Sequence, residues 1–134
     1  EIENLSYQYP WTIGQFKDTL KSNNTLANLV IVRGQIVGYC VANVCVDYAD
    51  ILNICVHPDY RKIGIGSALL SYQIEKLKGC GVDSVMLEVR SSNKVAFSYY
   101  EKNGFKSIEI RNRYYRNGED AIIMRQTFQQ QSTN

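Results

Sequence analysis

The stretch that decides the fold is residues 53–70, NICVHPDYRKIGIGSALL. It begins with an apolar, strand-like run, Ile54-Cys55-Val56. The chain then turns at His57-Pro58, because proline fixes its own φ and disfavours helix just before it. A helical pattern follows and opens with two glycines, Gly64 and Gly66. The stretch therefore predicts a strand, a turn and a helix in direct succession.

The start of this predicted helix has the features of a phosphate cradle. Glycines let the backbone approach a ligand closely, and the unpaired N–H groups and dipole of a helix N-terminus favour an anion. Arg61 and Lys62 add positive charge beside the glycines. An ordinary tight turn is the alternative that a glycine pair leaves open.

Two common nucleotide cradles do not match the stretch. The dinucleotide pattern G-x-G-x-x-G fails because Leu69 stands where the third glycine is needed. The P-loop pattern fails because no Gly-Lys-Ser/Thr follows. What remains is R-x-x-G-x-G between a strand and a helix.

The size and composition of the chain indicate one domain. It has 134 residues, 45% of them hydrophobic, and a formal net charge of +2 without a basic run, which argues against a nucleic-acid partner. No apolar run approaches the roughly 20 residues that span a bilayer, and no signal-peptide pattern opens the chain. We expect a cytoplasmic monomer with no membrane contact, a single domain at 1–127 and a polar tail at 128–134.

The cysteines and the single histidine do not form a metal site. None of the four cysteines, Cys40, Cys45, Cys55 and Cys80, lies in a C-x-x-C pair. Three of them fall in apolar runs, where cysteine behaves as a small buried hydrophobe. His57 precedes a proline, so we interpret it as a turn residue and not as a catalytic base. No metal is expected.

The predicted elements alternate between helix and strand. They give a mixed sheet with helices on its faces, in the α/β (α+β) class. The ranges are a helix at 12–21, strands at 29–33, 36–46 and 51–56, a helix after Gly66 to about 78, a strand at 85–89, a helix from 92 or 93 to 104, and strands at 105–115 and 120–126.

Three residues in the second half of the chain are candidates for chemistry. Glu88 lies in an apolar strand, where a carboxylate either faces solvent or occupies a cleft that raises its pKa. Asn93 and Tyr100 lie two turns apart on one helix face. Asn93 can simply cap that helix, and Tyr100 can be a core aromatic whose hydroxyl reaches water.

Together these segments resemble the GCN-related N-acetyltransferase (GNAT) family, and within it the bacterial RimI group of ribosomal-protein-alanine N-acetyltransferases. The resemblance covers nearly the whole chain. It is carried by residues 53–70, by LEVRSSN at 87–93, by YEKNGF at 100–105, by EDAIIM at 119–124, and by the aromatic segments Tyr9-Pro10-Trp11 and Arg113-Tyr114-Tyr115.

The resemblance implies acetyl-CoA as cosubstrate and a role for each matching residue. Glu88 would be the general base and Tyr100 the general acid. The residues implied in cofactor binding are Ile54, Cys55 and Val56 on the pantetheine arm, Asn93 on the same arm, and Arg61, Lys62, Ile63, Gly64, Ile65, Gly66 and Ser67 at the pyrophosphate. The residues implied as a peptide channel wall are Tyr9, Trp11, Tyr114 and Tyr115.

The implied reaction is direct acetyl transfer to the α-amine of an N-terminal alanine, on small-subunit ribosomal protein eighteen. A covalent intermediate on Cys55 is disfavoured because no histidine is placed to activate the thiol. Two other functions stay open: acetylation of a small amine or a lysine side chain, and acyl-CoA binding without catalysis. Members of the family begin with a strand and a helix, so the first strand is expected to be missing here, where only nine residues precede Pro10.

Overall fold

A computed structural model describes residues 24–61 and 63–128. The chain divides into two compact units, Glu1–Val82 and Asp83–Asn134. Several predictions lie outside the described residues and keep their standing as predictions. They are the helix at 12–21, the wall residues Tyr9 and Trp11, the loop residue Lys62, the missing first strand and the tail beyond Phe128.

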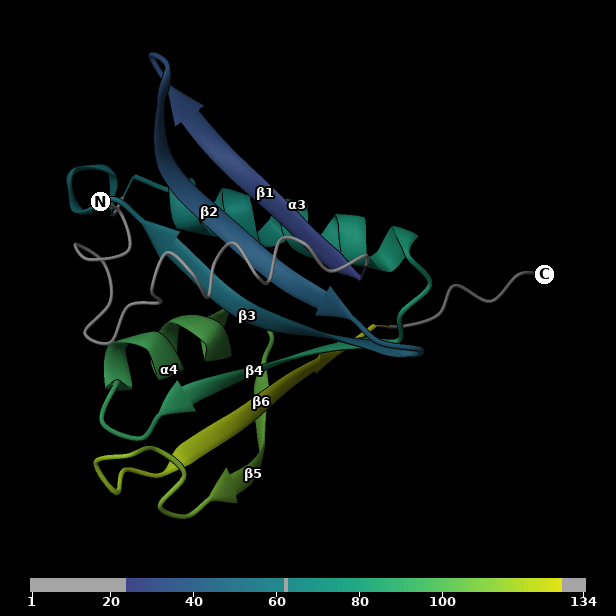
Figure 1. Cartoon of the computed structure of the whole chain (residues 1–134), viewed down its shortest axis with the longest axis vertical. Coiled ribbons are helices and arrows are strands. Elements are labelled where there is room, and N and C mark those ends of the chain that lie inside the picture. The colour runs from purple at the N-terminus through teal and green to yellow at the C-terminus, as the bar shows by residue number, and fades with distance from the viewer. Residues whose placement is uncertain (1–23, 62, 129–134) are drawn as a thin grey trace. The chain divides into compact units, whose positions relative to one another are not determined.

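The first unit contains a meander of three antiparallel strands, β1 (Thr25–Val32), β2 (Gln35–Val44) and β3 (Tyr48–Val56) (Figure 1). The turn between β1 and β2 is Arg33-Gly34, one residue before the gap that the predicted strands at 29–33 and 36–46 leave between them. Both turn residues have positive φ, 52° and 80°. This is the type of two-residue turn whose twist matches that of the flanking strands.

One helix, α3 (Ile65–Gly79), packs against these strands (Figure 1). Its buried stripe contains Leu70, Ile74 and Leu77, which are spaced at i, i+4 and i+7 in the sequence. The helix begins at Ile65, so Gly66 lies inside the first turn and not before it, which corrects the predicted start. Close packing explains Gly38 in β2, because a Cβ there would lie 3.3 Å from the Cys55 carbonyl oxygen and 3.7 Å from Ile65.

A fully buried glutamine adds a polar contact between α3 and β1. The Gln73 side chain donates to the Leu26 carbonyl at 2.9 Å and accepts from the Asn28 amide. Buried polar groups are costly unless they are hydrogen-bonded, and here both ends of the amide are used. Gln73 therefore fixes where α3 lies along β1.

The second unit contains β4 (Ser84–Arg90), α4 (Lys94–Lys102), β5 (Lys106–Arg111) and β6 (Ala121–Thr127). In this unit β6 lies between β4 and β5 and is antiparallel to both. Alternate residues of β4 are buried, in the period-two pattern of a strand that covers a core. The core of the unit consists of Val85, Leu87 and Val89 of β4, Ala121, Ile123 and Met124 of β6, and Phe105.

The predicted strand at 105–115 was too long, because β5 ends at Arg111. Arg113 has φ of 52°, in the left-handed region, and its N–H donates to the Asp120 carboxylate at 2.9 Å. That contact closes the end of the hairpin as a loop and removes residues 112–115 from the strand ladder. Tyr114 and Tyr115 therefore lie in a loop and not in a strand.

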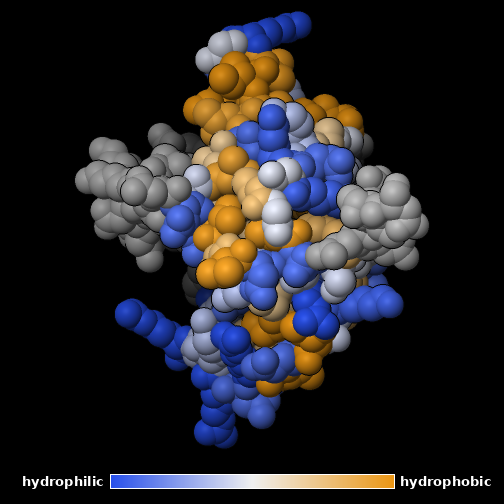
Figure 2. All heavy atoms as spheres, turned by 90° about the vertical axis from the view of Figure 1, so that its right-hand side faces the viewer, coloured by the Kyte–Doolittle hydropathy of each residue, from blue (hydrophilic) through white to orange (hydrophobic). Residues whose placement is uncertain are grey.

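Apolar side chains reach the surface at the end of the β1–β2 hairpin. Ile31 and Ile36 are 59% and 47% exposed, and Figure 2 shows apolar surface gathered at that end of the molecule. None of the helices in the described part of the chain is long and apolar enough to cross a membrane.

Candidate active site

The segment that follows β3 is shaped by η1, a short 3-10 helix (Pro58–Tyr60). Pro58 occupies the first position of this helix, where a missing N–H costs nothing. The His57 Nδ1 atom accepts a hydrogen bond from the Asp59 N–H at 3.1 Å, and its ring meets Tyr60 edge-on at 5.8 Å. The prediction that His57 is a turn residue is confirmed.

The phosphate loop, residues 61–67, leads into α3 with its helix N-terminus uncapped. Gly64 is the N-cap residue, with φ of 89° and ψ of 0°, and it supplies no side-chain cap. The first N–H groups of a helix have no acceptor within the helix. A Cβ at position 64 would meet nothing within 4 Å, so the space beside this backbone is open. The phosphate loop therefore fits an anion held by main-chain amides.

Arg61 has a contact that the sequence did not predict. Its Nε atom donates to the Val56 carbonyl oxygen at 3.1 Å. This hydrogen bond ties the phosphate loop to the last residue of β3. The predicted role of Arg61 at a phosphate stays a prediction.

Two of the four cysteines of this unit, Cys40 and Cys55, are buried, whereas Cys45 is half-buried and Cys80 is exposed. Cys55 is 3% exposed and packs with Tyr39 and Val41. Burial raises the pKa of the Cys40 thiol to about 12. The prediction that three cysteines are buried hydrophobes is wrong for Cys45, because this residue lies beyond the end of β2 and is only half-buried. The burial of Cys55 does not favour a covalent role for its thiol. Among the described residues no group of three or more His, Cys, Asp or Glu could hold a metal ion.

In the second unit the Glu88 side chain faces solvent, which is one of the two alternatives that the sequence left open. The burial of β4 alternates, and Glu88 is exposed between the buried Leu87 and Val89. Burial among its strand neighbours is therefore not available to strengthen this carboxylate as a base.

The structure brings Glu88 together with Tyr114 and Tyr115. A hydrogen bond to Glu88, followed by its negative charge, raises the pKa of Tyr114. Burial, followed by the charge of Glu88, raises the pKa of Tyr115 to about 12. The two rings meet edge-to-face with centroids 5.2 Å apart. We call Tyr114 and Tyr115 the peptide wall. Glu88, the predicted base, thus lies beside Tyr114, one of the two predicted wall residues that the structure describes.

The predicted acid and helix cap lie at opposite ends of α4. The Asn93 side chain accepts from the Ala96 N–H at 3.1 Å, so its capping role is confirmed. Tyr100 is half-buried, and its ring meets Phe105 edge-to-face at 5.8 Å. This packing fits the interpretation of Tyr100 as a core aromatic, and its role as a general acid stays a prediction.

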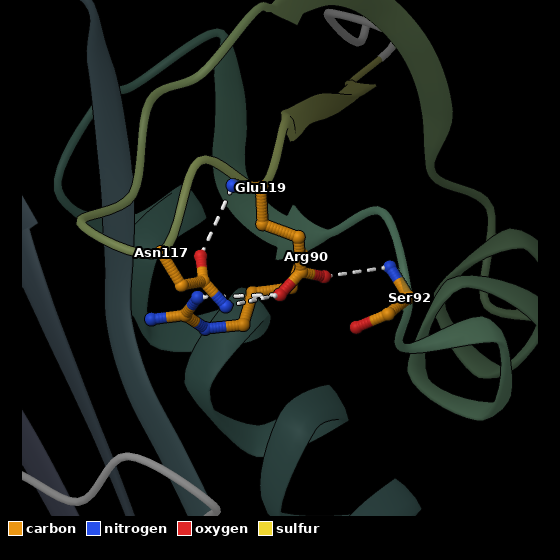
Figure 3. A network of polar contacts seen from close by, with 4 residues as sticks. All are labelled: Arg90, Ser92, Asn117 and Glu119. Carbon is orange, nitrogen blue, oxygen red and sulfur yellow. Dashed lines mark hydrogen bonds and ion pairs between the residues drawn. The ribbon is translucent and has the colours of Figure 1, made fainter.

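A polar cluster that the sequence did not predict lies next to the peptide wall (Figure 3). The Glu119 carboxylate accepts from the Ser92 N–H at 2.9 Å and from the Asn117 side chain at 3.1 Å, and it pairs with Arg90 at 3.5 Å. The hydrogen bonds from Ser92, then that from Asn117, and the charge of Arg90 lower the pKa of Glu119 to about 2. The signal in the sequence was two opposite charges, one ending β4 and the other just before β6.

Arg90 connects this cluster to the peptide wall. Its guanidinium carbon lies 3.7 Å from the centroid of the Tyr115 ring. A cation this close to an aromatic face is attracted by the negative charge of the ring face. Glu88, Tyr114, Tyr115 and Arg90 thus form a continuous chain of contacts within one unit.

Comparison with known proteins assigns the chain to a family. Residues 1–105 match the model of the acetyltransferase (GNAT) family. The chain belongs to this family. A GNAT relative from Escherichia coli K12, named [ribosomal protein bS18]-alanine N-acetyltransferase, is 36% identical over 92% of this chain and 84% of its own length.

Solved GNAT structures agree with this assignment. The crystal structure of the ribosomal-protein-S18-alanine N-acetyltransferase from Escherichia coli covers 99% of this chain and 87% of its own, with TM-score 0.89 and 35% identity. A Bacillus anthracis protein assigned as a streptothricin acetyltransferase, solved with acetyl coenzyme A, has TM-score 0.76 and 26% identity, covering 85% of this chain and 68% of its own. The predicted family and fold class are confirmed.

Proposed function

We propose that this protein transfers the acetyl group of acetyl-CoA to the α-amine of an N-terminal alanine, with ribosomal protein bS18 as its substrate. The single observation that carries the proposal is the contact of Glu88 with the peptide wall. Glu88 accepts a hydrogen bond from Tyr114, whose ring packs edge-to-face on Tyr115, in a chain that is 36% identical to an enzyme of that name. A carboxylate next to an aromatic wall suits a nucleophilic amine that arrives on a peptide.

Acetyl-CoA fits the phosphate loop. Its diphosphate would accept hydrogen bonds from the uncapped first turn of α3, where Gly64 leaves open space. Lys62 to Ser67 would surround the diphosphate, while Ile54 to Val56 and Asn93 would hold the pantetheine arm. These assignments follow the GNAT resemblance and rest on the main chain more than on side chains.

Proton transfer has to precede the attack. An α-amine has a pKa near ~8, so much of it is protonated at neutral pH. Because Glu88 is exposed, a water molecule between the amine and the carboxylate is the route that fits its surroundings. The free amine then attacks the thioester carbonyl, and an N–H of the segment from Ile54 to Val56 would stabilise the oxyanion.

Collapse of this adduct breaks the C–S bond and expels the thiolate, and the nitrogen gives up its second proton to solvent through the same water route as the neutral amide forms. Tyr100 would give its phenolic proton to that thiolate. A phenol has a pKa of about 10 and a thiol a pKa near 8.5, so the phenol is the weaker acid by roughly 1.5 units. Transfer of its proton to the thiolate is therefore unfavourable by about 2 kcal/mol. Donation is therefore favourable only as the C–S bond breaks. The Glu88 proton returns to solvent and Tyr100 is reprotonated from it.

The proposal treats residues 1–127 as one catalytic domain that works as a cytoplasmic monomer, with residues 128–134 outside it. Two other functions stay in competition with it. Acetylation of a small amine or a lysine has the Bacillus anthracis neighbour in its favour, but that likeness is 26% against 36% for the alanine enzyme. A non-catalytic acyl-CoA-binding module would have no use for both Glu88 and Tyr100.

The test is acetyl transfer measured by intact mass on three acceptors. The first is a short peptide that starts with the bS18 alanine, the second is the same peptide with a blocked N-terminus and an added lysine, and the third is a polyamine. We expect a mass gain on the first alone. A gain on the second or third alone would overturn the alanine assignment, and no gain on any acceptor despite acetyl-CoA binding would favour the non-catalytic module.

A further inference from the structure

We propose that Glu119 is a positioning residue for substrate: through Arg90 it holds the Tyr115 ring of the peptide wall, and through Ser92 it ties that wall to the start of α4. This inference rests on the proposed function, because it names what orients the peptide beside Glu88. Glu119 itself need not touch the substrate.

The first step is the stacking of Arg90. Its guanidinium carbon is 3.7 Å from the Tyr115 centroid, and its Nη1 atom is 3.5 Å from Glu119 Oε1. The side chains of Arg90 and Glu119 are 22% and 18% exposed. A partly buried guanidinium is planar and can stack on a ring while its edge meets a carboxylate. Tyr115, Arg90 and Glu119 therefore form one continuous stack and ion pair.

The second step is the connection to α4 (Figure 3). Glu119 Oε2 accepts from the Ser92 N–H at 2.9 Å, and the adjacent Ser91 N–H donates to the Asp120 carbonyl at 3.0 Å. Ser92 directly precedes Asn93, which caps α4. The loop that carries the peptide wall is thus joined to the segment that directly precedes α4, the helix that carries Tyr100.

The third step is the local closure of the loop. The Tyr115 N–H donates to the Glu119 carbonyl at 3.1 Å, and Glu119 exchanges two hydrogen bonds with Asn117, at 3.0 and 3.1 Å. Both the backbone and the ring of Tyr115 are therefore located relative to Glu119. A change at Glu119 is transmitted to the wall and, through the wall, to the neighbourhood of Glu88.

Three variants separate positioning from simple stability. Arg90→Lys keeps the charge but loses the planar stack on Tyr115. Glu119→Gln keeps an oxygen acceptor for Ser92 but presents no charge to Arg90. Glu75→Gln is the matched control, because Glu75 forms an exposed ion pair with Lys78 at 3.1 Å on α3.

The measurement is steady-state kinetics with the bS18 alanine peptide and acetyl-CoA, each varied in turn. For Arg90→Lys and Glu119→Gln we expect the KM for peptide to rise about 3- to 10-fold, the ratio that corresponds to losing a cation–π contact. The KM for acetyl-CoA should change by less than about 2-fold, because the phosphate loop is untouched. The control should match the wild type in both constants.

A Tyr115→Leu background makes the test specific. If Glu119 acts through the Tyr115 ring, Arg90→Lys should add no further rise in the peptide KM in that background. An equal rise with and without the ring would overturn the inference, as would equal effects on both KM values or no effect on either.

An NMR readout keeps this result apart from the proposed function. In the wild type the Arg90 side-chain protons should be shifted upfield by the Tyr115 ring, and Glu119→Gln should remove that shift. A shift that survives Glu119→Gln would overturn the inference whatever the enzyme acetylates. A wild type that shows the shift but leaves the alanine peptide unmodified would instead overturn the proposed function.

Discussion

In the proposed function the phosphate loop and the peptide wall would recognise their ligands by opposite means. The phosphate loop presents main-chain amides at an uncapped helix start, and its critical residue, Gly64, has no side chain. The peptide wall is made of side chains: Tyr114 is hydrogen-bonded to Glu88 and packs on Tyr115, and Arg90 lies over the Tyr115 ring. One region depends on backbone conformation and the other on side-chain identity.

This contrast has a physical reason. The diphosphate takes no part in the chemical step, so fixed amides and a helix dipole are sufficient to hold it. A peptide must be oriented with its amine at a base, which requires shape and a directed proton acceptor. Substitutions in the two regions should therefore affect different kinetic constants.

The largest effect is expected at the base. Glu88→Gln removes the proton acceptor beside the peptide wall and should lower kcat by ~10²–10⁴-fold, the usual size for loss of a general base. Affinity for acetyl-CoA should be nearly unchanged, because the phosphate loop is not altered. Single-turnover kinetics together with calorimetry of acetyl-CoA binding would check both expectations. A near-normal rate would remove Glu88 from the mechanism.

A smaller effect is expected at the acid. Tyr100→Phe keeps the edge-to-face contact with Phe105 but loses the phenolic proton. We expect the chemical step to slow by roughly 10²-fold, at the lower end for general acids because the transfer is uphill. The thermal midpoint should barely move. If single-turnover rates were unchanged, Tyr100 would be a packing residue only.

The phosphate loop should respond to a change of backbone conformation alone. Gly64 has φ of 89°, a region that costs other residues roughly 1–2 kcal/mol, so Gly64→Ala strains the turn. We expect a KM for acetyl-CoA that is ~10-fold higher, with the KM for peptide unchanged.

Gly79→Ala is the matched control for that substitution. Gly79 lies in α3 with nothing within 4 Å of the added methyl group, so this variant should gain about 0.5–1 kcal/mol of stability and keep both constants. Equal kinetic effects at the two glycines would show that the conformation of Gly64 does not matter for acetyl-CoA.

Local features of both regions could be predicted from the sequence. The strand, turn and helix around Gly64, the buried stripe of α3 and the Asn93 cap all follow from spacing within a few residues. The end of β5 could not, because it depends on a hydrogen bond between Arg113 and Asp120 that no periodicity reports. The same holds for Glu119, whose partners Ser92 and Arg90 are 27 and 29 residues away. Family resemblance pointed to the segments but not to these contacts.

The smallest expected effect concerns Glu119 and the stability of the wall in acid. Its pKa is lowered from 4.5 to about 2 in the folded protein, so the unfolded chain takes up its proton first as the pH falls. The stabilisation by Glu119 should be complete above about pH 4.5 and be lost as the pH falls through about 2.

The difference in thermal midpoint between wild type and Glu119→Gln should then be positive at pH 6 and shrink toward zero near pH 2. Scanning calorimetry at several pH values would measure it. Glu75→Gln, at an exposed pair of the kind that adds at most about 1 kcal/mol, should show only a small difference at pH 6. A Glu119 difference that stayed constant down to pH 2 would mean that this carboxylate supports the peptide wall by packing and not by its charge.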